Sequence, residues 1–445
     1  MPRQPTAHSY NLIETAAPPV LHRYPTKSPL SSVHSTRFMV SYPEEGGFYM
    51  QIRLPESVKP LMGRLEAAGF EVFCVGGCVR DSLLGRKPDD WDLTTSALPQ
   101  QMETVFAGWR VLATGRRHGT ITVVSDSQPV EITTFRVDGG YRDGRHPEQV
   151  TFTPHLADDL ARRDFTVNAL AYSPHTGIVD RFDGVGDLRR RVIRAVGNPC
   201  LRFEEDALRI VRALRFASVL GFPIDPATAE ALRSHRQLLE KVSAERLFTE
   251  LCKLVCGETA DTVIQQFPEV IALLIDHFSP DGMRLHPLPA LPGIRLAMLM
   301  HAFSPAQADA VLLRLKADRA ARRTVTALLS RRDQPLPSSR AGIRQLVSEL
   351  GVQPLRDLLA FQGALGRETG PACHWLERIL ADGDCWNLGM LAVDGHDLLS
   401  AGIPAGRELG ETLRFLLMQV VKGRLPNQKS ELLRAATANG TRGAP

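Results

Sequence analysis

The chain has 445 residues, of which 43% are hydrophobic and 23% are charged, and its formal net charge at pH 7 is +4. This length predicts roughly two to four domains with a substantial core, and the composition is that of an ordinary globular protein. The composition excludes a membrane protein of the helical kind, because no apolar run approaches the roughly 20 residues that a span needs. The mild positive charge fits a nucleic-acid partner without requiring one.

Seven cysteines are spread along the chain. The pairs Cys74/Cys78 and Cys252/Cys256 lie in apolar runs, and a zinc site usually needs tighter pairs with further Cys or His. We therefore predict reduced core thiols and a reducing compartment, the cytoplasm.

Residues 1–50 are rich in Ser, Pro, His and Thr and poor in acids before Glu44. This composition predicts a disordered extension. Two other interpretations are a transit peptide, because acids are scarce and Arg is scattered, and a start codon placed too early, with Met50 as the working start.

Up to about residue 190, short runs rich in β-branched and aromatic residues alternate with helical patterns. The predicted strands are Glu71–Val75, Trp91–Thr94, Thr120–Val124, Val130–Arg136 and Gln149–Phe152. The predicted helices are Ser57–Ala68, Val79–Leu84, Pro99–Phe106 and Asp159–Ala171. This mixture predicts an α/β module.

After residue 200 the apolar residues recur at helical spacing almost throughout. The predicted helices are Glu204–Leu220, Pro226–Ser234, Ala244–Val255, Arg295–His301, Pro305–Leu315 and Ala320–Leu329. The predicted fold class is therefore α+β, with an N-terminal mixed α/β head followed by an all-α remainder.

The strongest chemical feature is Asp90-Trp91-Asp92. On a strand, residues i and i+2 point to the same face, so the two carboxylates converge. Carboxylates that share a site repel each other unless a cation lies between them, and Mg²⁺ is suited to one or two carboxylates plus substrate phosphates. Such a site supports in-line phosphoryl transfer. For an isolated Asp-x-Asp, the alternative is a strand-end turn with solvated carboxylates.

A possible phosphate site precedes this pair. Gly76-Gly77 lies between the predicted strand Glu71–Val75 and the predicted helix Val79–Leu84. Backbone amides and a helix N-terminus can hold phosphate at such a junction, and Arg80 can add a charge-assisted hydrogen bond. The alternative interpretation of the two glycines is a tight turn.

Glu131 and Arg163 each allow two interpretations. Glu131 faces away from its apolar neighbours in an alternating strand, so it either completes the metal site from an adjacent strand or is an exposed strand residue. Arg163, near a strand–helix junction, either binds a triphosphate or pairs at the surface with Asp158 or Asp159.

The predicted helix Glu204–Leu220 carries Asp206 and Arg209 three residues apart, so their side chains can meet. An Asp/Arg pair offers acceptors and a donor fork that can read the Watson–Crick edge of a free nucleotide. Arg212 and Arg215 continue this spacing, but each step turns by about 60°, which puts Arg215 nearly opposite Asp206. The alternative is a solvated helix with surface salt bridges.

From about Phe73 to Phe222, the chain closely resembles the class II tRNA nucleotidyltransferase and bacterial poly(A) polymerase superfamily. The matching segments occur in the family's order, and they are Gly76-Gly77-x-Val79-Arg80-Asp81, Asp90-Trp91-Asp92-Leu93-Thr94-Thr95, Glu131-Ile132-Thr133-Thr134-Phe135-Arg136, Arg162-Arg163-Asp164-Phe165-Thr166-Val167-Asn168-Ala169 and Glu205-Asp206-Ala207-Leu208-Arg209. The resemblance implies a metal-dependent enzyme that adds CCA to the 3′ end of tRNA from CTP and ATP and releases pyrophosphate.

The resemblance also implies roles for single residues. Asp90 and Asp92 would bind the catalytic Mg²⁺. The implied nucleotide contacts are Gly77, Arg80, Arg163, Asp206, Arg209, Arg212 and Arg215. Among these, Asp206 and Arg209 would select CTP or ATP through hydrogen bonds to the base edge.

The implied organisation is a disordered extension (1–50), a catalytic head (51–190), a neck for nucleotide selection (191–250), a body (251–350) and a tail that binds tRNA (351–436). Val137–Glu148 matches the flexible loop that such enzymes need to add A. His301-Ala302 has alanine where an HD phosphohydrolase has its metal-binding Asp, so we predict no phosphatase activity.

The C-terminal segments Val393–Leu399 and Gly423–Asn427 also resemble the tails of bacterial tRNA nucleotidyltransferases. Their alternative interpretation is helix capping and turn chemistry. The neighbouring cations Lys422, Arg424 and Lys429 are candidates for contact with tRNA phosphate.

Three alternative functions stay open. Gly115-Arg116-Arg117 resembles poly(A) polymerases, whereas His118-Gly119-Thr120 resembles the tRNA enzymes. An enzyme that adds only the terminal A is a second alternative. A noncatalytic RNA-binding protein is the third, although such a protein has little reason to keep two crowded carboxylates. No oligomeric state is predicted.

Overall fold

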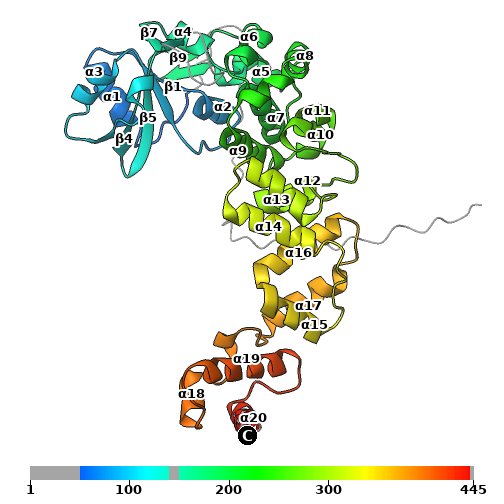
Figure 1. The fold of residues 1–445 in the computed structure, drawn as a ribbon. Coiled ribbons are helices and arrows are strands. Elements are labelled where there is room, and N and C mark those ends of the chain that lie inside the picture. Colours follow the sequence, from blue (N-terminus) through cyan, green and yellow to red (C-terminus); the bar gives the residue numbers. More distant parts are fainter. Residues whose placement is uncertain (1–50, 140–149, 441–445) are drawn as a thin grey trace, which may run out of the picture. The chain divides into compact units, whose positions relative to one another are not determined.

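The computed structural model describes residues 51–139 and 150–440. The predicted extension (1–50) and most of the predicted flexible loop lie outside these residues. The division into head, neck, body and tail stays a prediction. The predicted fold class is confirmed, because a mixed sheet with helices is followed by helices alone (Figure 1).

A seven-stranded mixed sheet forms the centre of the N-terminal part (Figure 1). Its strands, in spatial order, are β3 (Arg110–Leu112), β4 (Thr120–Ser125), β5 (Gln128–Thr134), β2 (Asp92–Thr95), β1 (Val72–Val75), β8 (Leu170–Ser173) and β9 (Gly177–Asp180). Neighbours within this sheet are antiparallel except for β2 and β5, which are parallel. A separate antiparallel pair consists of β6 (Arg136–Asp138) and β7 (Val150–Phe152). The five predicted strands are confirmed in place, although the predicted run Val130–Arg136 is divided between β5 and β6.

Strand β1 lies between two hydrophobic cores. All four of its residues are buried, and alternate side chains point to opposite faces of the sheet. Val72 and Cys74 join the main core, whereas Phe73 and Val75 join a smaller cluster with Phe135. Packing on both faces therefore fixes β1 in the sheet. Gly76, which follows the strand directly, has a defined position as a result.

The helices of the N-terminal part are α1 (Lys59–Ala67), α2 (Gly77–Leu83), α3 (Pro99–Val105), α4 (Leu156–Ala161) and α5 (Gly184–Arg190), with the 3-10 turns η1 (Arg116–His118) and η2 (Thr166–Asn168). The first three are the predicted helices, with ends shifted by one or two residues.

The predicted helix Asp159–Ala171 is wrong. The chain leaves α4 at Ala161, makes the turn η2 and enters β8 at Leu170. Asp164 favours this break, because its Oδ1 accepts hydrogen bonds from the Phe165 backbone N–H and the Asn168 side chain. Pairing of β8 with β1 and β9 then outweighs the helical pattern.

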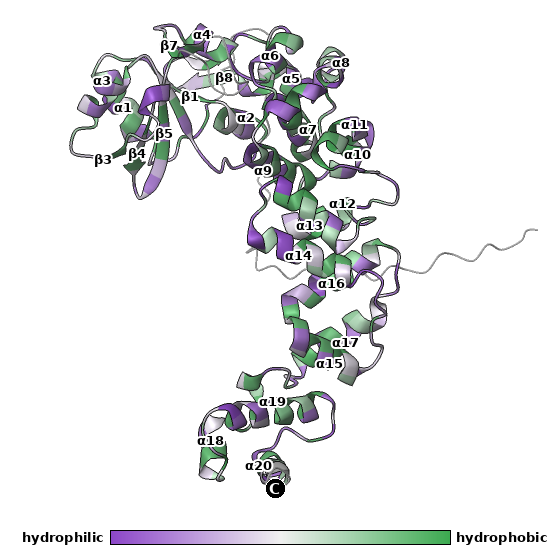
Figure 2. Ribbon diagram, in the orientation of Figure 1, coloured by the Kyte–Doolittle hydropathy of each residue, from purple (hydrophilic) through white to green (hydrophobic). Residues whose placement is uncertain are grey.

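The rest of the described chain is helical. The helices are α6 (Pro199–Glu205), α7 (Leu208–Leu220), α8 (Pro226–Ser234), α9 (Ala244–Val255), α10 (Ala260–Gln266), α11 (Pro268–Leu274), α12 (Pro292–Leu299), α13 (Pro305–Arg314), α14 (Arg319–Ser330), α15 (Arg340–Leu350), α16 (Val352–Ala364), α17 (Gly370–Ala381), α18 (Gly395–Ser400), α19 (Arg407–Val421) and α20 (Lys429–Gly440), with the 3-10 turns η3 (Arg236–Lys241) and η4 (Leu388–Met390). Individual helices carry both hydrophobic and hydrophilic residues (Figure 2), as expected for helices that bury one face.

The predicted continuous helix Glu204–Leu220 is also wrong. Helix α6 ends at Glu205, Asp206 is extended (φ −143°, ψ 101°), and α7 begins at Leu208. The Asp206 carboxylate accepts a hydrogen bond from the Leu208 backbone N–H (3.1 Å), a local bond that competes with helix continuation. Asp206 therefore lies at a junction between two helices.

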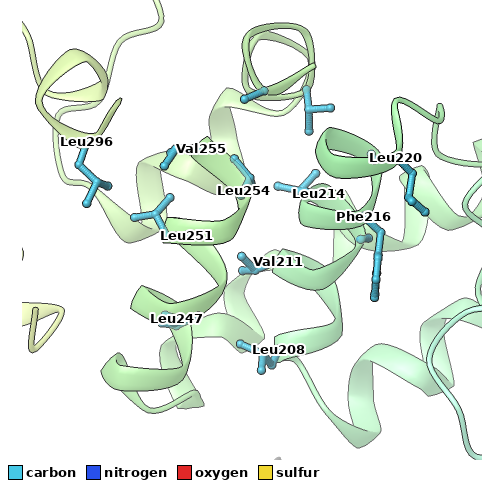
Figure 3. Packing of buried hydrophobic residues seen from close by; sticks show 14 of the residues in the cluster. Leu208, Val211, Leu214, Phe216, Leu220, Leu247, Leu251, Leu254, Val255 and Leu296 are labelled. Atoms are coloured by element: carbon cyan, nitrogen blue, oxygen red, sulfur yellow. The ribbon is translucent and has the colours of Figure 1, made fainter. Parts of the chain in front are cut away.

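Helices α7 and α9 pack through a row of leucines and valines (Figure 3). Val211 and Leu214 of α7 and Leu251 and Leu254 of α9 are all fully buried. The two residues of each pair are three positions apart, which puts them on one face of their helix. This apolar contact fixes the orientation of α9 relative to α7, and with it the positions of the charged residues of α9 that face α7.

A separate small core lies under α18, α19 and α20. Asp394 caps α18 in a reciprocal capping box with Asp397. The Asn427 side chain donates to the Met390 carbonyl and accepts from the Ala392 N–H, both at 2.8 Å. The two tail motifs thus perform the capping and turn chemistry that their alternative interpretation predicts.

All seven cysteines lie in the described residues and are free thiols. The prediction of core thiols holds for Cys74, Cys78 and Cys385, which are buried, whereas the other four are partly exposed. Within residues 51–139 and 150–440, no helix is long and apolar enough to cross a membrane.

The α7–α9 contact leads to a stability prediction. Leu251→Ala should lower the free energy of unfolding by about 2–5 kcal/mol, because it leaves a cavity in a fully buried position. The matched control is Leu313→Ala on α13, whose side chain is 58% exposed, and this change should stay within about 0.5 kcal/mol. Equilibrium denaturation in urea measures both variants. Equal losses would show that the α7–α9 contact is not the packed core described here.

Candidate active site

Three carboxylates gather where β2 begins. Asp92 is the first residue of β2, Asp90 precedes it by two positions, and all three side chains, including that of Glu131, are exposed. Glu131 of β5 is the register partner of Asp92 in the parallel β2–β5 pair. Partners in register point to the same face of a sheet. Glu131 therefore lies beside Asp92 and is exposed as well, which is compatible with both of its interpretations.

The electrostatics of Asp92 show that these carboxylates interact. The surrounding protein displaces part of the hydration of the Asp92 carboxylate, although the residue keeps exposed surface. This desolvation, together with the negative charges of Asp90 and Glu131, raises the pKa of Asp92 from 3.8 to about 6, while Arg163 acts in the opposite direction. A cation between the carboxylates would relieve this repulsion.

The protein alone does not provide a complete set of metal ligands. Among the described residues, no group of three or more His, Cys, Asp or Glu side chains is arranged to hold an ion. Mg²⁺ commonly keeps one or two carboxylates and takes its remaining ligands from water and substrate phosphates. The exposed pair Asp90 and Asp92 fits such a shared site.

Gly76 and Gly77 lie at the junction of β1 and α2, as predicted. Gly76 has φ +80°, a conformation that favours glycine, and its N–H donates to the Leu170 carbonyl at 3.0 Å. A Cβ added at Gly76 would lie 3.1 Å from Arg163 Nη1. Glycine therefore permits both the turn and the close approach of Arg163.

Two guanidinium groups are held beside this junction. Arg80 donates from Nη1 to Asn168 Oδ1 (2.6 Å) and from Nε and Nη2 to Asp81. Arg163 Nη2 lies 3.2 Å from Asp159 Oδ2. Burial raises the pKa of Asp159, but the combined effect of Arg163 and Arg162 is larger and opposite, so the pKa of Asp159 lies below its ordinary value.

Arg163 pairs with Asp159, one of the two partners named in its second interpretation, but Asp159 is fully buried rather than at the surface. Triphosphate binding by Arg163 stays a prediction, and the side chain also approaches Gly76 and acts on Asp92. Its Nε is buried and has no hydrogen-bond partner within the described part of the chain. The charge of Arg163 therefore lies between the glycine junction and the carboxylates.

The predicted pairing of Asp206 with Arg209 is wrong. Arg209 is 8% exposed and donates to Glu205 (2.6 Å) and to the Arg162 carbonyl (2.8 Å). Asp206 instead accepts from Arg246 Nη2 of α9 at 2.8 Å. The prediction assumed one continuous helix, and the break between α6 and α7 removes the helical spacing between Asp206 and Arg209. The predicted position of Arg215 opposite Asp206 depended on the same continuous helix and is not supported either.

Arg212 and Arg215 point to shared acidic partners. Arg212 donates from Nε and Nη2 to Asp164 Oδ2, at 2.8 and 2.6 Å. Glu250 of α9 lies 3.6 Å from Arg212 and 2.8 Å from Arg215. Burial raises the pKa of Asp164, yet Arg212 and the Asn168 hydrogen bond lower it to far below its ordinary value.

Sequence reasoning missed two residues of this region, Arg246 and Glu250. They are four residues apart on α9, so they lie on one face of the helix, and both face charged groups of α7 or its junction. A charged pair within an otherwise amphipathic helix was the available signal. It did not identify the partners, because those lie about 40 residues earlier in the chain.

The raised pKa of Asp92 leads to a second prediction. An ionised Asp92 destabilises the metal-free fold fully above pH 6 and not at all below pH 3.8. Asp92→Asn should therefore raise the thermal midpoint at pH 7.5, and this gain should vanish as the pH falls towards 3.5. Differential scanning calorimetry without and with Mg²⁺ measures it, and Mg²⁺ should stabilise only the wild type.

Asp89→Asn is the control for this measurement, because it removes another exposed carboxylate of the same segment. It should leave the midpoint nearly unchanged. A destabilised Asp92→Asn protein at pH 7.5 would contradict the crowding of these carboxylates.

Comparison with known families agrees with this geometry. A poly A polymerase head domain model matches residues 72–194, a model for the RNA- and SrmB-binding site of polymerase A matches 221–270, and a tRNA nucleotidyltransferase domain 2 model matches 295–436. The carboxylates and the glycine junction lie within the first match, and α9 lies within the second, which begins directly after α7 ends.

Individual relatives cover most of the chain. The CCA-adding enzyme of Limosilactobacillus fermentum is 36% identical over 397 residues, which are 86% of this chain and 96% of the relative. The crystal structure of the Bacillus stearothermophilus CCA-adding enzyme in complex with CTP has 30% identity and a TM-score of 0.69, and the match covers 87% of this chain and 98% of that one. The Thermotoga maritima CCA-adding enzyme complexed with tRNA shares the fold, with a TM-score of 0.60 at 22% identity. By these similarities, the chain belongs to the CCA-adding enzyme family of nucleotidyltransferases.

Proposed function

We propose that this protein adds CCA to the 3′ end of tRNA, taking C and A nucleotides from CTP and ATP and releasing pyrophosphate. The observation that carries this proposal is the crowding of Asp90, Asp92 and Glu131 beside a glycine junction that holds Arg80 and Arg163. Family membership and the similarity to a CTP-bound relative support the choice of reaction.

The family implies dependence on a divalent metal, and we propose Mg²⁺ as that ion. Asp90 and Asp92 would hold it with hard oxygen ligands, and Glu131 is the third carboxylate nearby. Once bound, the metal would stabilise the charge that develops on the attacking and leaving oxygens. In the reaction, the 3′ oxygen of the RNA bonds to the α-phosphorus, and the bond from that phosphorus to pyrophosphate breaks.

We propose that the positive side of the site binds the triphosphate. Gly76 and Gly77 allow close approach of the backbone, and Arg80 and Arg163 supply guanidinium donors. Arg80 is oriented by Asp81 and Asn168, and Arg163 by Asp159. Because these partners hold the side chains before substrate arrives, less entropy is lost on binding.

We propose that Asp206 selects the nucleotide. Its side-chain partner in this conformation is Arg246, and not Arg209 as the sequence predicted. Asp206 is partly exposed at the junction between α6 and α7. Arg209 would read a base only after leaving Glu205, to which it donates at 2.6 Å. Arg212 and Arg215 would line the same nucleotide pocket.

For the RNA, we propose that the C-terminal helices contribute phosphate contacts through Lys422 and Arg424, which are exposed. Lys429 pairs with Asp397 at 2.5 Å, so it contributes less readily. The cytoplasm is the proposed compartment, in agreement with the free thiols.

A transcript assay tests the reaction. Purified protein and Mg²⁺ are incubated with tRNA transcripts that end before CCA, after C or after CC, with CTP and ATP supplied singly and together. Growth by CCA followed by arrest is expected. Long A tails would instead identify a poly(A) polymerase, addition only to the CC-ended transcript would identify an A-adding enzyme, and binding without extension would identify a noncatalytic protein.

In the same assay, Asp92→Ala should reduce incorporation to background, because the metal site loses one of its two carboxylates. Asp89→Ala should retain activity, since it removes an exposed carboxylate that has no assigned role. Circular dichroism should show the same helical content for both variants. Activity in the Asp92→Ala protein would remove Asp92 from the metal site.

The selection role has its own test. Asp206→Ala should increase incorporation of UTP or GTP relative to CTP and ATP by about tenfold, because one lost base contact is worth roughly 1–3 kcal/mol. Glu204→Ala is the control and should keep the wild-type preference, because Glu204 lies in the last turn of α6, next to the junction, and its side chain is 56% exposed. Binding of tRNA, measured by gel shift, should change little in either protein. Unchanged nucleotide preference in Asp206→Ala would exclude Asp206 as a base reader.

A further inference from the structure

Three guanidinium groups surround the ring of Phe216. The Cζ atoms of Arg80, Arg212 and Arg215 lie 5.1, 5.3 and 3.9 Å from the ring centroid. Arg212 and Arg215 belong to α7, as does Phe216, whereas Arg80 comes from α2 beside the glycine junction. One aromatic ring thus links a proposed phosphate contact to the proposed nucleotide pocket.

The ring is itself fixed in place. Phe216 is 6% exposed and packs edge-to-face against Phe165 at 5.7 Å between centroids. Figure 3 shows Leu214 and Val211 on the side of α7 that meets α9, while Phe216 lies on the other side. The packing of α7 on α9 therefore directs Phe216 towards the segment that holds Asn168 and Asp164.

The acidic and amide partners connect these guanidinium groups only in pairs. Glu250 lies near both Arg212 and Arg215. Arg80 donates to Asn168, which donates to Asp164, the partner of Arg212. The Phe216 ring is the contact that all three guanidinium groups share.

The charges explain why an aromatic ring suits this place. Burial lowers the pKa of Arg215 to about 10, Arg212 and Arg80 lower it as well, and Glu250 opposes them. Three cations close together repel one another, and a further carboxylate would occupy their N–H donors. The face of a ring attracts cations while leaving those donors in the guanidinium plane for a ligand.

We propose that Phe216 is a positioning residue for nucleotide binding, which holds Arg80 from the head side and Arg212 and Arg215 from α7 as one preorganised set. This proposal rests on the proposed function, because the ligand is the nucleoside triphosphate of the same site. Phe216 acts through the three arginines and has no contact of its own with the substrate.

Two changes at position 216 separate the ring's charge distribution from its shape. Phe216→Leu removes the ring. Site-specific replacement of Phe216 by trifluorophenylalanine keeps the shape and weakens the negative face of the ring.

The matched control is Phe222→Leu. Phe222 is 4% exposed and lies two residues after the end of α7. Within the described residues its ring meets one guanidinium, that of Arg191, at 5.3 Å from the centroid.

The measurements are the dissociation constant for CTP without RNA, KM and kcat for CTP and ATP on a transcript, misincorporation of UTP, and the thermal midpoint. Phe216→Leu should weaken CTP binding by about tenfold, which corresponds to about 1.4 kcal/mol, and raise KM and misincorporation more than it lowers kcat. The trifluoro protein should show a smaller change in the same direction with an unchanged thermal midpoint. Phe222→Leu should lower the midpoint without changing CTP affinity or nucleotide preference.

Wild-type CTP affinity in the trifluoro protein would overturn the proposal. This outcome can be measured even if Phe216→Leu fails to fold. Equal losses of CTP affinity in Phe216→Leu and Phe222→Leu would overturn it as well, because the ring would then have only a structural role. If the wild-type protein binds CTP but extends no transcript, the proposed function is wrong. The role of Phe216 is then still decided by the CTP-binding measurements.

Discussion

The buried carboxylate of Asp164 is the contact on which the arrangement of the site depends. Asp164 accepts hydrogen bonds from the Phe165 backbone and the Asn168 side chain, and it is bound by Arg212 from α7. Asn168 in turn accepts from Arg80 beside the glycine junction. A buried charge is costly unless it is paired and hydrogen-bonded, so this carboxylate is stable only when the segment before β8, the glycine junction and α7 are all in place.

The carboxylates at β2 show the opposite balance. Asp164 and Asp159 are buried with guanidinium partners, and both have lowered pKa values. Asp92 faces Asp90 and Glu131, and its pKa is raised. The same type of side chain therefore stabilises the fold in one place and destabilises the metal-free protein in the other. Repulsion of this kind between carboxylates is typical of functional sites.

The chemistry of the site followed from local patterns. The Asp-x-Asp pair, the two glycines and the alternation around Glu131 each depend on residues within a few positions, and strand geometry converts such spacing into a shared face. The sequence left open whether the strand that carries Glu131 lies beside the Asp-x-Asp strand. Only the sheet decides this, because the parallel pairing of β2 with β5 brings Asp92 and Glu131 into register.

The partners of the arginines could not be derived in this way. Arg212 donates a hydrogen bond to Asp164, which lies 48 residues away along the chain, and Arg246 donates to Asp206, which lies 40 residues away. Helical spacing offered Arg209 as a nearer partner for Asp206, but a local bond from Asp206 to the Leu208 N–H ends α6 and breaks that spacing.

The sequence by itself determined the class of fold, the Asp-x-Asp pair, the glycine junction and the family resemblance, because these depend on residue type and on short-range periodicity. Only the tertiary structure decided where α7 begins, which acid each arginine meets and that three guanidiniums surround Phe216. The physical reason is that an ion pair or a ring contact forms between any two compatible groups that packing brings together. Packing of α7 against α9 and of the segment before β8 against α7 is a property of the whole chain and not of any one segment.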